Sequence, residues 1–482
     1  MEKSLCYNHW VLICGNAGIG RQARFRILCD SSRGGSSPFS RTKMSRAERC
    51  GFFVSEFTLK GIAPIGDSMN RVIKRMADLA DKHSLEMIPC APSAVSLAAA
   101  RIRGIPVVLY GFDESRHGGA LGIFEGRALL KGFQIARKAE VPLIGLVVSA
   151  GADLLDGKGS LLAAAKVFRA CKDLTVPHLY LSYGTCIGAS AYLSSLADLT
   201  LAVKDASYFC LTGPRIVEAS IFEKASLKEL GDSVHFASLG GCHILADSES
   251  EMGEAAKELL TYLKRDRRFS VAPIKNPPDK SPFSMAEVID SFIDGNSSIE
   301  LWKLWAPNVI TSFAYVAGHR LAVVANNPEF AGGVIDSESA KKMASFYTLC
   351  ERFHIPVISL VDTPGFLPGT ESEREGVLLS GGELLSAYMN HRAPKITVAV
   401  GKVFGGSYMA MGSPAMGGKA YAAFPESLIG VMAPSLESEI LKVKRTNIGD
   451  ASISSFAAKE RDIVDDIIYP SDLRSYVRRK LV

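Results

Sequence analysis

The sequence predicts an α/β protein built from two similar domains in tandem. A repeated glycine pattern, an alternation of apolar runs with helical spacing, and the chain length of 482 residues all favour this fold class. A chain this long exceeds a single hydrophobic core, because domains usually hold about 100 to 200 residues. With 47% hydrophobic and 22% charged residues, the composition is typical of a globular protein.

The repeat is clearest in GTCIGASAYLSS at 184–195 and GKVFGGSYMAMG at 401–412. The best offset is 217 positions in this region and 214 positions upstream, which a three-residue insertion would explain. The aligned pairs include Pro177 with Pro394, Gly184 with Gly401, Gly188 with Gly405, Ser190 with Ser407, and Gly118–Gly119 with Gly332–Gly333. The conserved order of glycines and prolines within one chain indicates duplication.

Each half alternates strand-like and helix-like segments. The apolar runs VPLIGLVV (141–148) and IPVISLVD (355–362) predict buried strands. The segments at 125–140 and 337–353 have helical spacing and end at the next X-Pro step. This alternation predicts βαβ units with crossover helices.

The domain boundaries follow from the repeat and from the prolines. Four prolines at 270–284 interrupt any periodic pattern. We expect a basic N-terminal arm at 1–60, an N-terminal domain at 61–265, a Pro-rich linker at 266–300 and a C-terminal domain at 301–482.

The net charge of +5 comes largely from the start of the chain. Residues 1–50 contain nine Lys or Arg residues, and a basic start of this kind is either a poorly ordered arm or a transit peptide. We therefore expect a cytoplasmic protein, or an organelle-matrix protein if the start is a transit peptide. Basic residues are not interleaved with aromatic ones, so no nucleic-acid partner is expected. The longest uncharged apolar run, 141–152, is too short to span a membrane.

The ten cysteines form no CxxC pair and predict reduced thiols. Cys6, His9 and Cys14 lie close together, but a structural zinc site needs four ligands in two tight pairs. No metal is expected.

The repeated glycines have a chemical interpretation. In both copies a Gly-small-small step ends an apolar run and opens a helical stretch, where the first N–H groups lack helical partners. Small residues there let the backbone approach an oxyanion closely. A plain tight turn is the alternative for one such motif. Two matched copies, each preceded by a second glycine loop at 149–152 or 363–366, favour two oxyanion sites.

Three segments carry a family resemblance: VDTPGFLPGTESEREGVLLSGGELLSAYMNHRAPKITVAVGKVFGGSYMAMGSP (361–414), ASYFCLTGPRIVEASI (206–221) and IVDDIIYPSDLRSYVRRKL (463–481). The sequence resembles the carboxyltransferase β subunits of biotin-dependent acyl-CoA carboxylases of the propionyl-CoA type, over roughly residues 100–480. The resemblance implies two tandem crotonase-like domains of the ClpP/crotonase ββα-superhelix type. It also implies that a carboxyl group moves from carboxybiotin to the α-carbon of a short acyl-CoA.

The reaction implied by the resemblance develops two negative charges. One is on the thioester oxygen of the enolate and the other on the biotin ureido oxygen, which accounts for two oxyanion sites. The resemblance implies catalytic roles for Gly188, Ala189, Gly406 and Ser407, acyl-CoA binding by Gly118, Gly119, Lys131, Ala150, Gly151, Ala152 and Met409, and biotin-side roles for Gly332, Gly333, Pro364, Gly365, Phe366 and Gly405.

The implied cofactors are biotin, presented by a carrier protein, and coenzyme A as part of the substrate. Because the chain has no AMKM-like biotin site and no GxxxxGK[ST] loop, biotin carboxylase and the biotin carrier are expected as separate partners. The resemblance also implies a homo-oligomer, from dimer to hexamer, whose facing sites belong to different subunits.

Three residues, Ala150, Asp153 and Met409, depart from the family pattern. The usual SGGAR is replaced by Ser-Ala-Gly-Ala-Asp at 149–153, so Asp153 reverses a charge near the expected CoA. Met409 replaces an aspartate linked to acyl selectivity, and it suits either another acyl group or core packing. The departures at Ala150 and Asp153, with the unusual N-terminal region, would suit a non-catalytic scaffold. A biotin-dependent decarboxylase subunit is a further alternative, because its sequence signals would be alike.

Several polar residues have structural interpretations. We expect His243 to be a structural histidine. Glu371, Glu373 and Glu375 are interpreted as charges near a helix N-terminus rather than as catalytic acids.

Overall fold

The computed structural model describes residues 71–264, 270–278, 283–442 and 453–481. The predicted basic arm at 1–60, and with it Cys6, His9 and Cys14, lies outside the described residues.

The N-terminal half contains one eight-stranded sheet, in which β1 to β6 lie side by side in chain order, β8 follows β6, and β7 pairs with β5. The strands are β1 (Glu86–Ile88), β2 (Val95–Ile102), β3 (Ile105–Phe112), β4 (Leu143–Ser149), β5 (His178–Ile187), β6 (Leu199–Val203), β7 (Tyr208–Cys210) and β8 (Ile244–Ala246). The helices are α2 (Arg71–Leu79), η1 (His117–Gly119), α3 (Ile123–Ala139), α4 (Lys158–Lys172), α5 (Ala189–Leu196), α6 (Pro214–Ile221), α7 (Leu227–Gly231), α8 (Ser233–Ser238) and α9 (Glu249–Lys264).

The C-terminal half repeats this arrangement with a second eight-stranded sheet of the order β9-β10-β11-β12-β13-β14-β16, in which β15 pairs with β13. The strands are β9 (Ile299–Leu301), β10 (Val309–Val316), β11 (His319–Asn326), β12 (Val357–Thr363), β13 (Lys395–Phe404), β14 (Ala420–Ala423), β15 (Leu428–Gly430) and β16 (Asp466–Ile467). The helices are α10 (Met285–Phe292), η2 (Ala331–Gly333), α11 (Ser337–Arg352), α12 (Thr370–Arg374), α13 (Val377–Asn390), α14 (Ser407–Ala410), η3 (Pro414–Met416), α15 (Pro434–Leu441), α16 (Ser455–Glu460), η6 (Pro470–Asp472) and α17 (Leu473–Leu481).

The two sheets share their strand order and their pairing sense. In both, the first three strands pair antiparallel and the later ones parallel. The offset between the copies changes from 214 at β4 and β12 to 217 at β5 and β13, and α12 lies between these strands in the C-terminal half only. The predicted α/β fold with an internal duplication is confirmed, as are the predicted strands and helices at 141–148, 355–362, 125–140 and 337–353.

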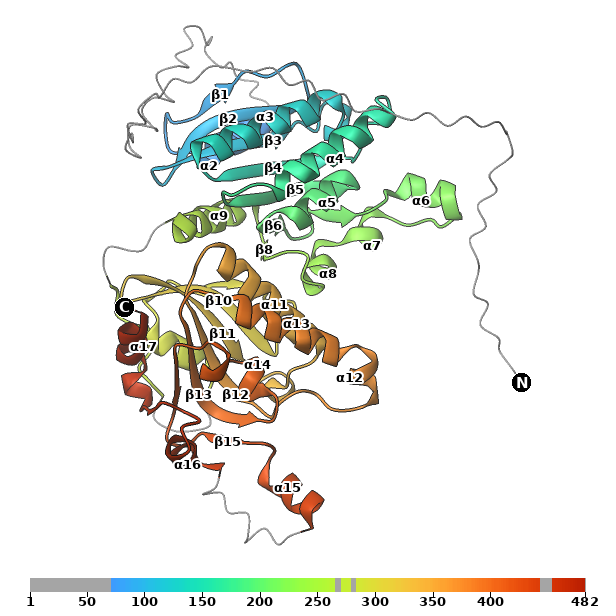
Figure 1. Ribbon diagram of the computed structural model, residues 1–482. Helices are drawn as coiled ribbons and strands as arrows, with labels where there is room; N and C mark the ends of the chain where they lie inside the picture. Colours follow the sequence, from blue (N-terminus) through green and yellow to red (C-terminus); the bar gives the residue numbers. More distant parts are fainter. Residues whose placement is uncertain (1–70, 265–269, 279–282, 443–452, 482) are drawn as a thin grey trace, which may run out of the picture. The chain divides into compact units, whose positions relative to one another are not determined.

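Alternate residues of each buried strand face opposite helical layers. In β3, Val108 and Tyr110 lie in a core cluster with α3 and α4, whereas Val107 and Leu109 lie in a cluster with α2 and α9. Figure 1 shows α3 and α4 lying over the N-terminal strands. Helices on both faces explain why these strands are apolar throughout instead of alternating with polar residues.

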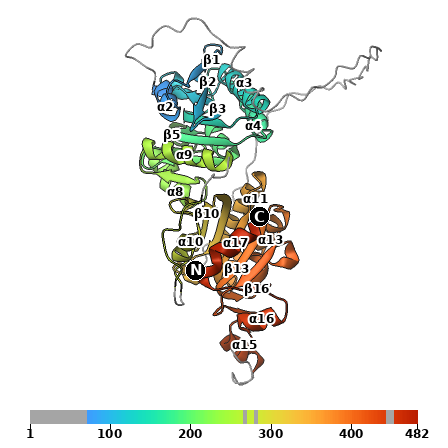
Figure 2. The same ribbon diagram turned by 90° about the vertical axis from the view of Figure 1, so that its left-hand side faces the viewer.

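In the C-terminal half, α11 and α13 cover one face of the sheet, and α10 and α17 pack on the other (Figure 2). Helix α10 lies within the segment 266–300 that the sequence predicted as a linker, and so does the start of β9. Since α10 begins 214 positions after α2, it is the counterpart of α2 and belongs to the C-terminal half.

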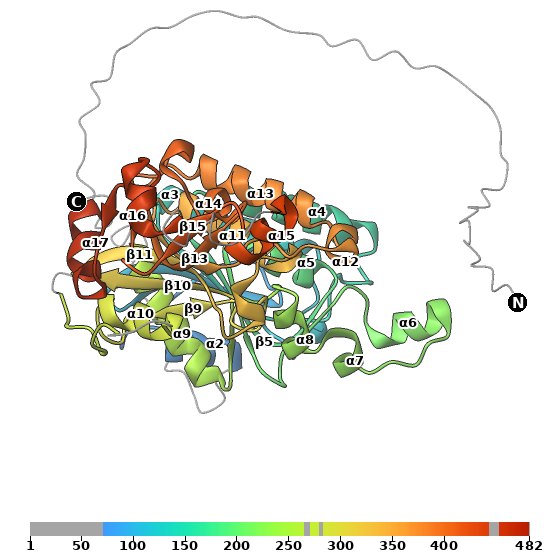
Figure 3. The same ribbon diagram turned by 90° about the horizontal axis from the view of Figure 1, so that it is seen from below.

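Helices α6 and α15 are also counterparts, 220 positions apart, and neither contains a buried residue. Helix α6 stands away from its sheet in Figure 3, as α15 does in Figures 1 and 2. Each half therefore has one short helix without buried residues, directly after the short strand β7 or β15.

Candidate functional site

Three loops meet beyond the carboxyl ends of β3, β4 and β5. A Cβ added at Gly118 would lie 3.1 Å from the Cβ of Ala150, and one added at Gly151 would lie 3.0 Å from the carbonyl oxygen of Ile187. The η1 loop, the loop after β4 and the start of α5 therefore form one continuous surface. The crevice outside the carboxyl ends of the strands is where open α/β sheets usually bind ligands.

Glycine is required in these loops for conformation. Gly118, Gly151 and Gly188 have φ of 64°, 100° and 58°, which L-residues with a side chain rarely adopt. Ala150, the alanine that replaces a family glycine, is not among the residues with positive φ, so the substitution causes no backbone strain.

The free amides of the N-terminal half identify its potential anion donors. Gly188 donates its N–H to the carbonyl of Cys210 at 3.0 Å, so this amide is unavailable to a ligand. By contrast, the N–H groups of Gly118, Ala152 and Ala189 have no acceptor within the described ranges. Gly188 therefore uses its amide within the fold, whereas the amide of Ala189, the other residue of the expected pair, has no acceptor among the described residues. The oxyanion role of the pair stays a prediction.

The C-terminal half repeats the arrangement. Gly405 has φ of 60° and donates its N–H to the carbonyl of Gly430 at 3.0 Å. The N–H groups of Gly332, Phe366 and Gly406 meet no acceptor in the part of the chain that the structure describes. Gly405 is therefore the counterpart of Gly188.

Gly188 and Ala189 of the first half therefore correspond to Gly405 and Gly406 of the second half. The catalytic pair expected in the second half, Gly406–Ser407, begins one residue later. The Ser407 hydroxyl donates to the carbonyl of Phe404 at 2.7 Å, and that of its counterpart Ser190 donates to Ile187 at 3.0 Å. Both hydroxyls hold the strand-to-helix turn.

The glycines of η1 and η2 allow close packing. A Cβ at Gly119 would lie 2.2 Å from the carbonyl oxygen of Val148, and one at Gly333 would lie 2.7 Å from that of Asp362. Among the other expected site residues, Lys131 on α3 donates to the carbonyl of Pro89, and Pro364 and Gly365 form the loop after β12. Met409 lies on α14 with its side chain 47% exposed, so it is not a core residue of this subunit.

A His–Asp pair links the η1 loop to the loop after β4. Nδ1 of His117 lies 3.3 Å from Oδ2 of Asp153, whose other carboxylate oxygen accepts the N–H of Leu155 at 2.9 Å. Sequence reasoning identified Asp153 as a departure but missed His117. The two residues are 36 positions apart, and only the tertiary structure brings them together.

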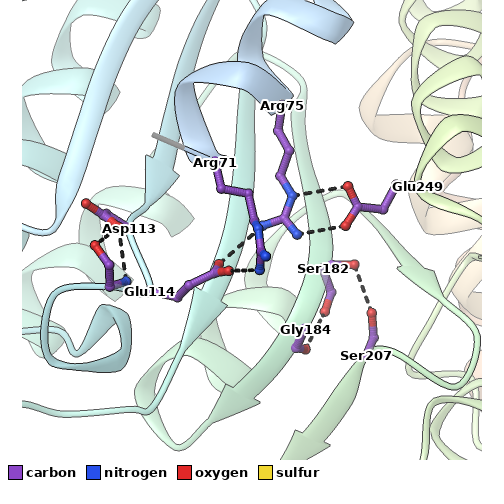
Figure 4. A network of polar contacts seen from close by, with 9 residues as sticks. Arg71, Arg75, Asp113, Glu114, Ser182, Gly184, Ser207 and Glu249 are labelled. Carbon is purple, nitrogen blue, oxygen red and sulfur yellow. Dashed lines mark hydrogen bonds and ion pairs between the residues drawn. The ribbon is translucent and has the colours of Figure 1, made fainter. Parts of the chain in front are cut away.

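An ion-pair network anchors the base of the η1 loop (Figure 4). Arg75 of α2 bonds Glu114, two residues after the end of β3, at 3.3 Å and Glu249 of α9 at 2.7 Å, while Arg71 bonds Glu114 at 2.6 Å. The Arg75 side chain is 9% exposed and lies over the ring of Tyr183. The network thus fixes the loop from the face of the sheet opposite α3.

The structural interpretation of His243 agrees with its environment. Its Nδ1 accepts the N–H of Thr200 at 3.0 Å, its ring packs on Trp302, and burial lowers its pKa to about 3. Glu371 and Glu373 lie in the first turn of α12, as expected for helix N-terminal charges, whereas Glu375 is the C-cap of this short helix.

The described residues contain no group of three or more His, Cys, Asp or Glu side chains that could hold a metal ion. None of their helices is long and apolar enough to cross a membrane.

Comparisons with known proteins agree with this architecture. The carboxyl transferase domain model matches residues 76–481. The propionyl-CoA carboxylase beta chain of Sus scrofa is 32% identical over 404 residues, covering 78% of this chain and 75% of its own. The methylmalonyl-CoA decarboxylase subunit alpha of Veillonella parvula is 30% identical over 404 residues, covering 78% and 79%.

Among solved structures, transcarboxylase 12S, described as a hexamer with hydrolysed methylmalonyl-coenzyme A bound, superposes with a TM-score of 0.79 at 28% identity. The match covers 85% of this chain and 88% of that one. Two crotonase-type domains in tandem, and a family model that spans most of the sequence, lead to one conclusion: the chain belongs to the carboxyl transferase domain family.

Proposed function

We propose that this chain is the carboxyltransferase subunit of a biotin-dependent acyl-CoA carboxylase. The observation that carries the proposal is that the same set of unpaired amides occurs once in each half. Carboxyl transfer from biotin to an acyl-CoA develops two separate negative charges, and each half supplies donors for one of them.

The N-terminal half would hold the acyl-CoA. Loss of the α-proton places negative charge on the thioester oxygen, and the Ala189 N–H at the start of α5 can donate to it. Gly118 and Ala152 supply further unpaired amides on the adjoining loops. One preorganised donor of this type is typically worth about 2.7 to 4 kcal/mol of barrier.

The C-terminal half would hold biotin. Its unpaired Gly406 and Phe366 amides fit an anionic ureido oxygen, and the ring of Phe366 lies 3.2 Å from where a Cβ on Gly406 would be. This narrow, amide-lined position suits a planar ring with a polar carbonyl. Biotin, presented by a carrier protein, would supply the carboxyl group there.

We further propose that the working form is a homo-oligomer in which the N-terminal half of one subunit faces the C-terminal half of another. Exposed apolar side chains flank both glycine motifs, and large exposed apolar patches usually mark interfaces. They include Leu161, Leu162, Leu211, Ile216 and Phe222 in the N-terminal half and Leu378, Leu379, Val431, Ile440 and Leu441 in the C-terminal half. The 12S relative is itself described as a hexamer.

The acyl group, the direction of the reaction and the cellular location are finer proposals. A short acyl-CoA is favoured by the propionyl-CoA carboxylase relative, and exposed Met409 is the expected apolar contact for its acyl chain. The decarboxylase relative favours the reverse reaction as a second candidate. The location in the cytoplasm, or in an organelle matrix, stays a prediction, because the basic start of the chain lies in residues 1–70, which the structure does not describe.

The first test is a calorimetric titration with acetyl-, propionyl- and longer-chain CoA esters. Binding of a short ester supports the proposal, whereas no binding to any ester favours the scaffold alternative. Co-purification with a membrane subunit would favour the decarboxylase.

A second test removes one amide. Because proline is tolerated in the first turn of a helix, Ala189→Pro deletes the N–H at the start of α5 without breaking the helix. We expect the carboxylation rate to fall about 10²- to 10³-fold. Ala189→Ser retains the N–H, and we expect it to lose far less. Equal losses in the two variants would contradict the assignment.

A further inference from the structure

The two halves differ at three matched positions around their glycine motifs. These are Phe366, Gly381 and Gly406 in the C-terminal half, and Ala152, Ala164 and Ala189 in the N-terminal half. One aromatic ring with two glycines therefore stands where the other half has three methyl groups. The exchange is concerted, because a large side chain at one position goes together with the loss of side chains at the other two.

The backbone shows that Ala152 and Phe366 occupy equivalent positions. Ala152 forms an isolated parallel bridge with Leu121, and Phe366 forms the same kind of bridge with Ile335. The glycine directly before Ala152 has φ of 100°, and the one directly before Phe366 has φ of 111°. The loops after β4 and β12 thus follow the same path, and the difference lies in their side chains.

The ring of Phe366 fills the space that the two glycines leave. A Cβ added at Gly406, directly before α14, would lie 3.2 Å from Cδ2 of Phe366, and one added at Gly381 on α13 would lie 3.3 Å from Cε1. Both separations are shorter than the optimal contact between carbon atoms of about 3.5 to 4.0 Å. Gly406 has φ of −61°, so this position requires glycine for space and not for conformation.

The amides alone do not distinguish the two halves. The N–H groups of Ala152 and Ala189, and those of Phe366 and Gly406, all lack an acceptor within the described part of the chain. Such donors stabilise an enolate oxygen and a ureido oxygen alike. Discrimination between the two ligands therefore needs a side chain that excludes the wrong one.

We propose that Phe366, for which Gly381 and Gly406 make room, is the specificity-determining residue that reserves the C-terminal half for biotin. This inference rests on the proposed function and explains how two similar frames take different ligands. The ring flanks the Gly406 amide and admits a flat ureido ring beside it. A thioester carries substituents on both sides of its carbonyl carbon, and one of them would meet the ring. The N-terminal half has only the methyl group of Ala152 there.

The first test gives the C-terminal half the three alanines of the other half, in the variant Phe366→Ala/Gly381→Ala/Gly406→Ala. The full chain transfers the carboxyl group of methylmalonyl-CoA to biocytin, the lysine adduct of biotin, and releases propionyl-CoA. We expect the KM for biocytin to rise about 10-fold or more and the KM for methylmalonyl-CoA to stay within about 2-fold. An unchanged KM for biocytin would overturn the proposal.

The reciprocal test moves the ring into the N-terminal half, in the variant Ala152→Phe/Ala164→Gly/Ala189→Gly. The ring should then exclude the thioester, so we expect the Kd of propionyl-CoA, measured by calorimetry, to rise about 10-fold or more. Binding at the wild-type affinity would contradict the proposal.

Stability measurements test the packing without any ligand. Ala152→Phe alone should have a lower urea midpoint than the triple variant, because the methyl groups of Ala164 and Ala189 remain where the C-terminal half has glycines. Equal midpoints would show that the three positions do not form one unit. Unfolding of the C-terminal triple variant would contradict the equivalence of the two frames.

The control and the wild type separate the two levels of failure. Phe456→Ala, on α16 with a side chain 55% exposed, should change neither the KM for biocytin nor the Kd of propionyl-CoA. If the wild type binds propionyl-CoA and both folded triple variants behave as the wild type does, Phe366 does not sort the ligands and the proposed function stands. If the wild type binds no propionyl-CoA, the proposed function fails and this inference fails with it.

Discussion

Neighbouring glycines in η1 tolerate a side chain very differently. Both Gly118 and Gly119 have positive φ, so alanine at either position is strained by about 1 to 2 kcal/mol. At Gly119 the new Cβ would also lie 2.2 Å from the carbonyl oxygen of Val148, whereas at Gly118 the nearest atom, the Cβ of Ala150, is at 3.1 Å. We therefore expect Gly119→Ala to lower the free energy of unfolding by at least about 1 kcal/mol more than Gly118→Ala, measured by urea denaturation. Equal losses would show that the loop moves away from β4.

Two histidines, buried His178 and half-buried His243, make stability depend on pH. Burial lowers the pKa of His243 to about 3, and burial followed by the charge of Arg352 lowers that of His178 to about 3. The unfolded chain binds protons at these residues below about pH 6.5 and the folded chain does not, so stability falls as the pH drops from about 6.5 towards 3. Each histidine contributes up to about 1.4 kcal/mol per pH unit. His243→Gln should be less stable at pH 7 but show a shallower loss of urea midpoint between pH 6.5 and 4.5. An unchanged slope would contradict the assignment.

At the scale of elements, α2 acts on the η1 loop through Arg75. Replacing Arg75 by methionine keeps much of the apolar contact with Tyr183. It removes the cation that pairs with both Glu114 and Glu249. We expect Arg75→Met to cost about 1 to 3 kcal/mol of stability and to raise the KM for acyl-CoA, because Glu114 begins the loop that carries Gly118. Lys228→Met removes an exposed ion pair with Asp205 and should cost less than about 1 kcal/mol. Similar effects of the two variants on stability and KM would argue against an anchoring role.

The elements also show what the sequence could predict. Continuous apolar runs at β4 and β12, ended by glycine loops, are strong local signals, and both strands were predicted within two residues. Helix α10 was not predicted, because the prolines before it led to the interpretation of 266–300 as a linker. Its offset of 214 from α2 becomes visible only once the structure shows both helices. The hydrogen bond of the Gly188 amide could not be predicted, because its acceptor, Cys210, belongs to another strand. The pairing of His117 with Asp153 is likewise a tertiary contact with no local pattern.

At the scale of the whole molecule, duplication explains why the two candidate sites are alike. Each half repeats the strand order, the positive-φ glycines and the unpaired amides of the described residues, so both inherit the same loop frame from one ancestor. The two halves then differ in the side chains and in the additional helix that their loops carry. Asp153 and His117 occur only in the first half, and α12 only in the second.

Mixing two defective chains tests whether the sites form between subunits. Ala189→Pro disables the N-terminal half, and Gly406→Pro disables the C-terminal half; Gly406 has φ of −61°, which proline can adopt. Each variant alone should be inactive. If a site combines the N-terminal half of one subunit with the C-terminal half of another, a mixed dimer has one site with both defects and one intact site. Co-expressing the variants with different tags and purifying on both tags should then restore up to about half of the wild-type carboxylation rate per dimer. If each site instead lies within one chain, every chain carries one defect and the doubly tagged protein stays inactive.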